Sequence, residues 1–412
     1  MVGRSLVVAS FLVWAAGCSK SKPLQPVGAG GVPASAGTAG AASDAGSTSN
    51  GIPALTVFDA ARISSNPSDP NFQALSADLD LSDGPYESAT LTADLGTTCF
   101  PFSSWADDPP PKGENWPADC DAFDRNFELS LDGPEPGDAS TSIGSGDSGT
   151  GGESGAGGDG GASGDGGAGG ITVRATPGLE IVRAITPFGG PMHIERDITA
   201  IANGLPGMHR IHARIATWAD AAGLVTGSNA GWNVTLKVAL KKGPALAPPL
   251  AVIPLFYGDL STMNEVSTSF TVPKGTTRGY LEYRTTGHGG AAGNVFACSG
   301  PAEEFCKRQH TIKLDGVTIK SFTPWVTCAS HCTLAKSGGD AGFDYCEENP
   351  CGAVESVKAP RANWCPGAET APVTIDTPGL ATPGVHDVSF HVSEIADGGN
   401  VRISLTYYAF SD

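Results

Sequence analysis

Three short stretches of this 412-residue chain place charged side chains beside cysteines and aromatic rings. They read CDAFDR at residues 120–125, AEEFCKRQH at residues 302–310 and APRANWCPG at residues 359–367. Together they supply carboxylates, guanidinium groups and aromatic rings, which are the parts of a carbohydrate or amide site at a domain interface. Taken singly, each stretch is more simply explained as a polar loop held by a disulfide bond. A site therefore requires that the fold bring the three stretches together.

The elements that must position these stretches are β-strands. The chain has 56 glycines and 31 prolines, which disfavour helices. Its apolar residues come mostly in short alternating runs, such as HRIHARIATW at residues 209–218 and NVRISLTYYAF at residues 400–410. A Pro-rich crossing near Gly243 separates two such regions. We expect two antiparallel β-domains in series, over residues 53–243 and 244–412.

The N-terminal sequence MVGRSLVVASFLVWAAGCSK indicates export. A basic residue precedes an apolar run that is too short to remain as a membrane-spanning helix. Because the run ends in AAGC, residues 1–18 resemble a bacterial lipoprotein signal, with Cys18 as the lipidated residue. This predicts an outer-membrane or cell-surface lipoprotein that touches the membrane only through its lipid anchor. An ordinary secretory signal, and hence a secreted or periplasmic protein, is the alternative.

Two low-complexity tracts predict segments without a packed core. Residues 19–52 consist mainly of small residues and predict a disordered tether. A tract rich in Gly, Ser and Asp, at about residues 133–170, predicts a disordered loop inside the first domain. The 43 acidic against 25 basic residues give a net charge of −18, which disfavours nucleic acid as a partner.

Export makes disulfide bonds the expected state of the remaining cysteines. They are Cys99, Cys120, Cys298, Cys306, Cys328, Cys332, Cys346, Cys351 and Cys365. Their number is odd, so one thiol is unpaired, or pairs outside the chain, or the lipoprotein prediction fails. The sequence CASHC at residues 328–332 allows a zinc site as an alternative, but export and the lack of CxxC pairs argue against it.

The three stretches resemble motifs of the peptide-N-glycosidase F family, bacterial amidases that cut N-glycans from asparagine. CDAFDR resembles the family's Cys-Asp-Glu-Trp-Asp-Arg segment. PAEEFCKRQHTI, residues 301–312, resembles its Cys-Ala-Glu-Trp-Cys-x-Arg-x-His-Thr-Ile segment, and RANWCPG, residues 361–367, matches Arg-x-x-Trp-Cys-Pro-Gly. The motifs occur in the same order, from about Ala54 to the C-terminus. We therefore expect an all-β chain of two antiparallel eight-stranded jelly-roll sandwiches packed side by side.

The resemblance assigns the key aspartate to Asp124 and its arginine partner to Arg125. We predict that Asp124 is the main acid/base group at the scissile amide and that Glu304 holds the substrate or bridges to it through water. Arg125 and Arg361 would orient acceptor oxygens with their guanidinium groups. No metal or other cofactor is expected.

The remaining predicted binding residues are Asp121 and two tryptophans, Trp364 and Trp218. The tryptophans would stack on sugar faces, or else belong to the core. Where the family carries a glutamate two residues before the second of these tryptophans, this chain has Ala216. A carboxylate of the family site is therefore missing.

Further departures lie near the same motifs. The tryptophan expected before Gly-His is Thr286 here. An insertion at residues 100–119 carries Trp105 and Trp116, which would form a new sugar platform or merely cap the domain. Where the family has a close-set cysteine before its glutamate, this chain has Ala302, so the resemblance implies that Cys298 takes its place across a longer loop. The cysteines for which we predict disulfides are Cys99, Cys120, Cys298, Cys306 and Cys365; how Cys328, Cys332, Cys346, Cys351 and Cys365 pair is left open.

The resulting hypothesis is an amidase that releases N-linked glycans from N-glycosylated proteins or glycopeptides and acts as a monomer. The main alternative is a non-catalytic glycan- or glycopeptide-binding surface lipoprotein on the same fold, which Ala216 favours. The two-sandwich architecture also resembles copper-dependent peptidylglycine hydroxylating monooxygenases. Copper chemistry needs clustered histidines, whereas the eight histidines of this chain are scattered.

Overall fold

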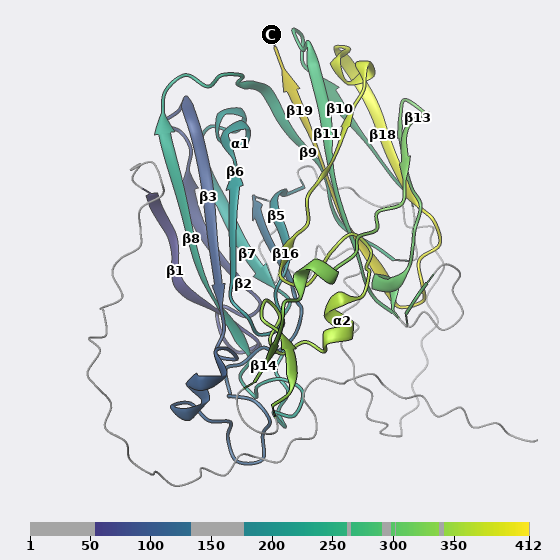
Figure 1. Ribbon diagram of the computed structural model, residues 1–412. Coiled ribbons are helices and arrows are strands. Elements are labelled where there is room, and N and C mark those ends of the chain that lie inside the picture. Colours follow the sequence, from purple (N-terminus) through teal and green to yellow (C-terminus); the bar gives the residue numbers. More distant parts are fainter. Residues whose placement is uncertain are drawn as a thin grey trace, which may run out of the picture.

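The computed structural model describes residues 54–132, 177–261, 265–290, 298–300, 302–337 and 342–411. The predicted signal peptide with Cys18, the tether and the Gly-rich loop lie outside these ranges. The described chain is built almost entirely from antiparallel strands, so the all-β prediction is confirmed (Figure 1). None of its helices is long and apolar enough to cross a membrane.

The first half of the chain forms a pair of facing sheets. One sheet has the order β1 (Ala54–Ser64), β8 (Gly231–Lys242), β3 (Tyr86–Gly96) and β6 (Met192–Asp197). The other has the order β16 (Ala368–Glu369), β5 (Leu179–Ile185), β4 (Asn126–Leu131), β7 (Met208–Ile215) and β2 (Ala74–Asp80). Alternate strand residues point into the shared core, among them the fully buried Leu91, Leu129 and Trp232.

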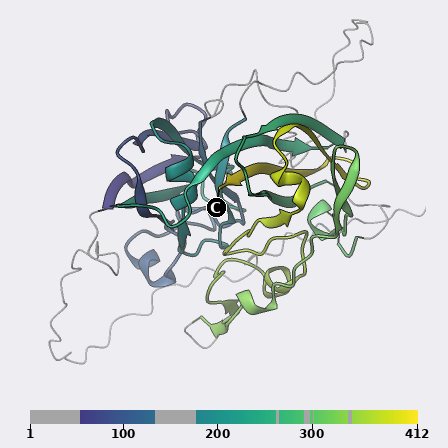
Figure 2. The same ribbon diagram turned by 90° about the horizontal axis from the view of Figure 1, so that it is seen from above.

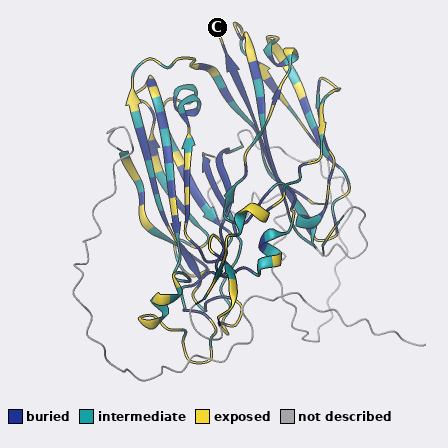
Figure 3. Ribbon diagram, in the orientation of Figure 1, coloured by how far each residue is buried: buried dark blue, intermediate teal, exposed yellow. Residues whose placement is uncertain are grey.

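The second half forms another pair of facing sheets. One has the order β17 (Val373–Asp376), β11 (Arg278–Gly289), β19 (Gly399–Phe410) and β9 (Pro249–Leu260). The other has the order β10 (Glu265–Val272), β18 (Gly384–Val392), β12 (His310–Leu314) and β13 (Val317–Phe322). Tyr283, Phe390 and Leu405 lie in the core between them. In Figure 3 the buried residues follow the strand interiors of both halves.

The two halves are joined side by side as well as through the chain (Figure 2). β16 belongs to the second half of the sequence but pairs with β5 of the first half, with Ala368 opposite Ile185. Val252 and Tyr408, from β9 and β19, pack into the core of the first half. Segments far apart in the sequence therefore meet along this contact.

The short elements gather mainly at one end of the sheets, at the bottom of Figure 1. They include β14 (Leu334–Lys336), β15 (Asp344–Cys346), α2 (Val354–Lys358), η1 (Phe102–Ala106), η3 (Glu303–Phe305) and η4 (Ala329–His331). Helix α1 (Thr199–Gly204) and η5 (Pro378–Ala381) lie near the other end.

Four disulfides hold this loop-rich end together among the described residues. They join Cys99 to Cys120, Cys298 to Cys306, Cys328 to Cys365, and Cys332 to Cys346. The cysteines of the sequence CASHC are thus disulfide-bonded, so the zinc alternative is wrong. Cys351 is buried and lies outside these four bonds.

One His–Asp arrangement occurs in both halves. His209 Nδ1 lies 2.7 Å from the Asp132 carboxylate, and His386 Nδ1 lies 2.7 Å from that of Asp315. In each case the histidine Nε2 is 2.8 Å from a backbone carbonyl oxygen, so both ring nitrogens face acceptors. Burial alone would lower the pKa of His386, but the hydrogen bonds to Asp315 and to this carbonyl raise it above its ordinary value.

Candidate active site

Arg361 joins the two predicted carboxylates. Its Nη1 lies 2.7 Å from Glu304 Oε1, and its Nη2 lies 3.7 Å from Asp124 Oδ2. The guanidinium is almost fully buried, whereas the side chains of Asp124 and Glu304 are 18% and 23% exposed. The fold therefore brings one residue from each of the three sequence stretches to a single place, where both carboxylates remain accessible to solvent.

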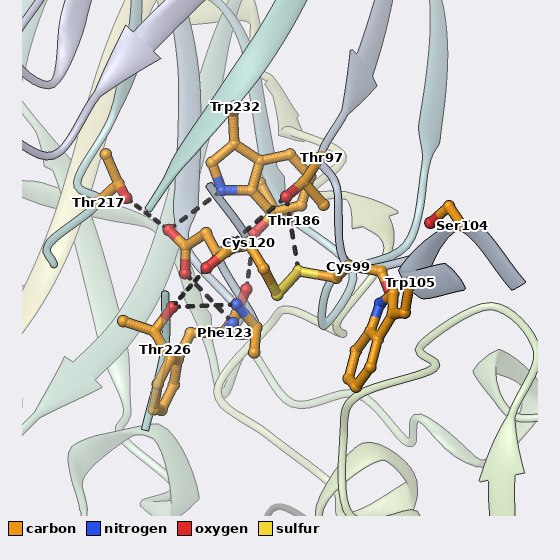
Figure 4. The surroundings of a disulfide bond; sticks show 12 residues. Thr97, Cys99, Ser104, Trp105, Cys120, Phe123, Thr186, Thr217, Thr226 and Trp232 are labelled. Atoms are coloured by element: carbon orange, nitrogen blue, oxygen red, sulfur yellow. Dashed lines mark hydrogen bonds between the residues drawn. A yellow bond between two sulfur atoms is a disulfide. The ribbon is translucent and has the colours of Figure 1, made fainter. Parts of the chain in front are cut away.

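The loop that carries Asp124 is fixed from within by Asp121. This carboxylate is fully buried and accepts hydrogen bonds from Arg125 Nε (3.1 Å), the Thr217 hydroxyl (2.5 Å) and Trp232 Nε1 (3.2 Å). Figure 4 shows Thr217 and Trp232 joined by dashed lines to this same carboxylate, beside the Cys99–Cys120 disulfide that begins the loop. Asp121 thus reaches no solvent-accessible surface, and its place in the structure is to position the loop and Arg125.

Asp124 sits in surroundings that favour its protonated form. Burial raises the pKa of Asp124, the Arg361 guanidinium opposes that rise, and the Glu304 carboxylate adds to it; the result is a pKa of about 7. Burial also raises the pKa of Glu304, against the opposing charge of Arg361. At neutral pH, Asp124 is therefore present in both protonation states, which suits general acid–base work.

Glu303, the residue before Glu304, lies in the interior of the protein. Glu303 is fully buried and accepts hydrogen bonds from Arg308 Nε (2.6 Å) and Nη2 (2.8 Å) and from the Ala396 backbone N–H (2.8 Å). These bonds hold η3, so that the next residue, Glu304, lies against Arg361. His310, also in this stretch, lies 2.8 Å from the Tyr283 hydroxyl in the core.

Trp364 is part of the wall behind Arg361. It is 3% exposed, and its Nε1 donates to the Gly287 carbonyl at 2.8 Å. Its ring lies 4.3 Å from the Arg361 guanidinium carbon and stacks on the His288 imidazole with centroids 5.6 Å apart. Burial, followed by the charge of Arg183, lowers the pKa of His288 to about 3, so this imidazole is neutral at physiological pH. Trp364 therefore supports the arginine and does not present a face to a ligand.

Trp218 is half-buried and offers an aromatic surface beside the loop of Asp124. Its ring centroid lies 5.4 Å from that of Phe123, and the Arg125 guanidinium carbon lies 4.9 Å from the Trp218 ring. Ala216 lies two positions before it, just after the end of β7. The nearest acidic residue in sequence, Asp220, accepts backbone hydrogen bonds within its own turn. No carboxylate of this segment replaces the one expected at position 216.

The insertion at residues 100–119 caps one end of the first half. Trp116 is 5% exposed and packs edge-on against Trp105, with ring centroids 6.0 Å apart. Phe102 in turn contacts Tyr345 of β15 at 5.5 Å. The aromatic residues of the insertion therefore pack against one another and against the β14–β15 hairpin, as in the capping alternative.

A buried ionic network between the two halves was not predicted from the sequence. Arg402 on β19 pairs with Glu128 on β4 and with Asp259 on β9, at 2.8 and 2.9 Å. Arg183 pairs with Glu180 within β5 at 2.8 Å. The charges of Arg402, Arg183 and Arg214 outweigh burial and hold the pKa of Glu128 below its ordinary value. The signal that could have found these residues is the presence of charges inside strands that otherwise read as apolar.

This network reaches the candidate active site through one hydroxyl. Arg183 Nη1 donates to Thr286 Oγ1 at 3.2 Å, and the same oxygen lies 2.7 Å from His288 Nε2. Thr286 is the position where a tryptophan was expected. A small hydroxyl residue here connects the buried arginine to the imidazole behind Trp364.

Residues 256–409 match the family described as "Peptide-N-glycosidase F, C terminal". The fold is similar to that of PNGF-II, with a TM-score of 0.58 and 17% identity over 87% of this chain; the chain spans 65% of the length of PNGF-II. It is also similar to PNGase F, a glycosylasparaginase from Flavobacterium meningosepticum, with a TM-score of 0.55 and 16% identity over 87% of this chain and 96% of that one. A sequence search among curated proteins gives no match.

The resemblance to the peptide-N-glycosidase F family, first seen in three short motifs, is thereby confirmed. The family match covers the second half of the chain, and the structural similarity extends over both halves. At 16–18% identity the structural comparison establishes the fold, while the chemistry rests on the residues of this chain.

Proposed function

We propose that this chain is a peptide-N4-(N-acetyl-β-glucosaminyl)asparagine amidase-like hydrolase. It would release N-linked glycans from glycoproteins or glycopeptides by cleaving the asparagine side-chain amide. The observation that carries the proposal is the contact of Asp124 and Glu304, from opposite halves of the chain, with the single guanidinium of Arg361. The similarity to peptide-N-glycosidase F supports the choice of a glycosylated amide as substrate.

The proposed reaction is the addition of water to the amide carbonyl carbon. The C–N bond to the asparagine side chain then breaks, the nitrogen takes a proton, and the asparagine becomes an aspartate. The sugar leaves as a glycosylamine, which a second water hydrolyses to the free sugar and ammonia. Asp124, with a pKa of about 7, can take the proton from water and return one to the departing nitrogen.

The other groups would bind and orient the substrate. Glu304 would hold the substrate or a bridging water beside Asp124. The buried Arg361 keeps the two carboxylates together and stabilises the negative charge that they share once ionised. Trp218, half-buried beside Arg125, supplies an aromatic face on which a sugar ring can stack.

A non-catalytic glycan-binding protein is the second candidate. The observation that favours it is Ala216, which leaves the site one carboxylate short of the family pattern. Such a protein would keep the aromatic surface at Trp218 and the fold but would not turn over substrate.

The proposal also includes the location and state of the protein. Four disulfides among the described residues are typical of an exported protein. Anchoring through a lipid on Cys18, at the outer membrane or cell surface, and a monomeric state complete the proposal; secretion without the anchor is the alternative.

The test is incubation of the purified protein with a denatured N-glycoprotein, followed by mass spectrometry of its peptides. The hydrolase predicts the mass change of Asn→Asp at the glycosylated position, and a loss of about 10²–10⁴-fold in rate for Asp124→Asn. If the wild type and Asp124→Asn both release nothing yet both retain affinity for the glycan, the binding protein is the correct reading.

A further inference from the structure

A polar cavity lies between the two halves, away from the candidate active site. Its volume is about 170 Å³. That is well above the roughly 10–15 Å³ that one water needs and below the about 300–1,000 Å³ of sites for drug-sized ligands. It therefore has room for a ligand of about one ring.

The cavity is separated from the active site along β11. Tyr280, Glu282 and Arg284 line the cavity from one face of this strand, because alternate residues point the same way. The same alternation continues to Thr286 and His288, which lie at the active site. His288 lies six positions beyond Glu282, or about 20 Å of extended strand. The fully buried Arg183–Glu180 pair contacts both stretches of the strand, so the two places are distinct.

The charged groups at the cavity pair with one another. Two guanidinium groups, Arg196 and Arg284, lie beside two carboxylates, Glu282 and Glu369. The exposed Asp197 carboxylate instead accepts a hydrogen bond from the Thr199 backbone N–H. Both arginines contact Glu282, at 3.8 and 3.7 Å, which is longer than a direct hydrogen bond. Arg196 Nη1 also donates to Glu369 at 3.5 Å, and Arg284 Nη1 donates to the Glu180 carbonyl at 3.1 Å. A ligand would therefore use their other N–H groups and the Glu282 oxygens. A neutral ligand fits such a lining, because it need not separate the existing ion pairs.

Arg284 brings a buried donor, unpaired within the described part of the chain, to the lining of the cavity. Its side chain is 3% exposed, and its Nε has no hydrogen-bond partner among the residues that the structure describes. A buried donor without a partner costs about 1–3 kcal/mol, so such atoms are usually satisfied by water or by a bound molecule.

The remaining wall is aromatic and aliphatic. Tyr280 lines the cavity and stacks on two other rings, on Tyr408 with centroids 5.0 Å apart at 16° and on Phe410 with centroids 5.7 Å apart at 18°. Ile198 and Ile201 complete the lining near α1. A pyranose ring combines these requirements, since its hydroxyls donate and accept around the rim and its C–H faces pack on aromatic rings.

We propose that this cavity is a saccharide-binding site that takes one neutral pyranose ring, independently of the candidate active site. Planar carboxylate and guanidinium groups would bind adjacent hydroxyls, while Tyr280 packs on the ring face. The site does not depend on amide hydrolysis and would remain in a chain that has no catalytic activity.

The test is titration of the intact folded chain with methyl α-mannoside, N-acetylglucosamine and methyl β-galactoside, followed by isothermal calorimetry and ligand-observed NMR. At least one of these sugars should bind, with little dependence on salt. Glu282→Gln and Tyr280→Ala should each weaken its affinity about tenfold or more, whereas Tyr280→Phe, which keeps the ring, should not. Trp218→Ala, at the active site, should leave this binding unchanged.

A substitution that fills the cavity distinguishes a loss of the binding site from a loss of the fold. Ala200→Phe adds volume to the lining without removing a charge, and it should abolish the binding while the thermal transition stays cooperative. The proposal is overturned if no sugar binds, if Glu282→Gln and Ala200→Phe leave the affinity unchanged, or if free glycine or leucine binds there instead with strong salt dependence.

Discussion

Arg361 offers a sharp test of the electrostatics at the paired carboxylates. Replacement by Gln removes the positive charge 3.7 Å from Asp124 and 2.7 Å from Glu304. Opposite charges about 4 Å apart attract by about 4 kcal/mol at an effective dielectric constant near 20. This energy corresponds to a shift of about three pH units in the titration midpoint of Asp124, which is an upper limit. Because the Asp124 side chain is 18% exposed and Arg125 is also near, we expect the midpoint to rise by at least about one pH unit.

The measurement is a pH titration of the side-chain carboxyl carbons by ¹³C NMR, with Asp124→Asn to assign the signal. Arg361→Lys is the matched control, because it keeps the charge but loses the planar guanidinium. The Lys variant should keep the Asp124 midpoint close to the wild-type value near 7. If Arg361→Gln leaves that midpoint unchanged or lowers it, the guanidinium does not set the ionisation of this carboxylate, and the reasoning fails.

Three further predictions follow from the described contacts. Glu304→Gln should lower the midpoint of the Asp124 titration, the opposite sign to Arg361→Gln, because it removes a like charge; an unchanged NMR midpoint would contradict this. Arg402→Met removes the guanidinium that pairs with the buried Glu128 carboxylate, leaving it the Tyr257 hydroxyl, and should lower the free energy of unfolding by up to about 3–5 kcal/mol in urea. The double variant with Glu128→Gln should recover part of that loss, and an equal loss in both variants would argue against the pair. The raised pKa of His386 means that its contacts stabilise the fold below its ordinary pKa and lose this effect as pH rises through the folded value. His386→Asn should therefore lower the melting temperature more at about pH 5.5 than at about pH 9, and a loss that is equal at both would contradict it.

The parts of the site that could be predicted are those carried by local sequence. Asp124, Glu304 and Arg361 each lie in a short polar stretch beside a disulfide cysteine, and the structure brings all three together. The strands were predictable because apolar residues alternate along them, as in β19. Both signals depend on near neighbours in the chain.

The parts that could not be predicted depend on contacts between distant segments. Residue type does not distinguish a buried positioning carboxylate such as Asp121 from an accessible one such as Asp124; only the fully buried partners, Thr217 and Trp232, make the difference. Trp364 likewise has the residue type of a sugar platform but is covered by the fold.

The buried ionic network between the two halves could not be predicted from the sequence for a similar reason. Glu128 and Arg402 are 274 positions apart, so nothing local indicates that they form an ion pair. The cysteine pairing was left open because spacing alone does not select among the possible connectivities. The cavity beside Tyr280 is also formed only when β11 of the second half meets α1 of the first.

Hydrolysis of an N-glycopeptide in water enriched in ¹⁸O tests the central claim most directly. If the paired carboxylates cleave the asparagine side-chain amide, the wild type should convert that residue to aspartate carrying one ¹⁸O atom, and Asp124→Asn should convert it about 10²–10⁴-fold more slowly. An intact glycopeptide after prolonged incubation with the wild type, or equal conversion by Asp124→Asn, would contradict the account.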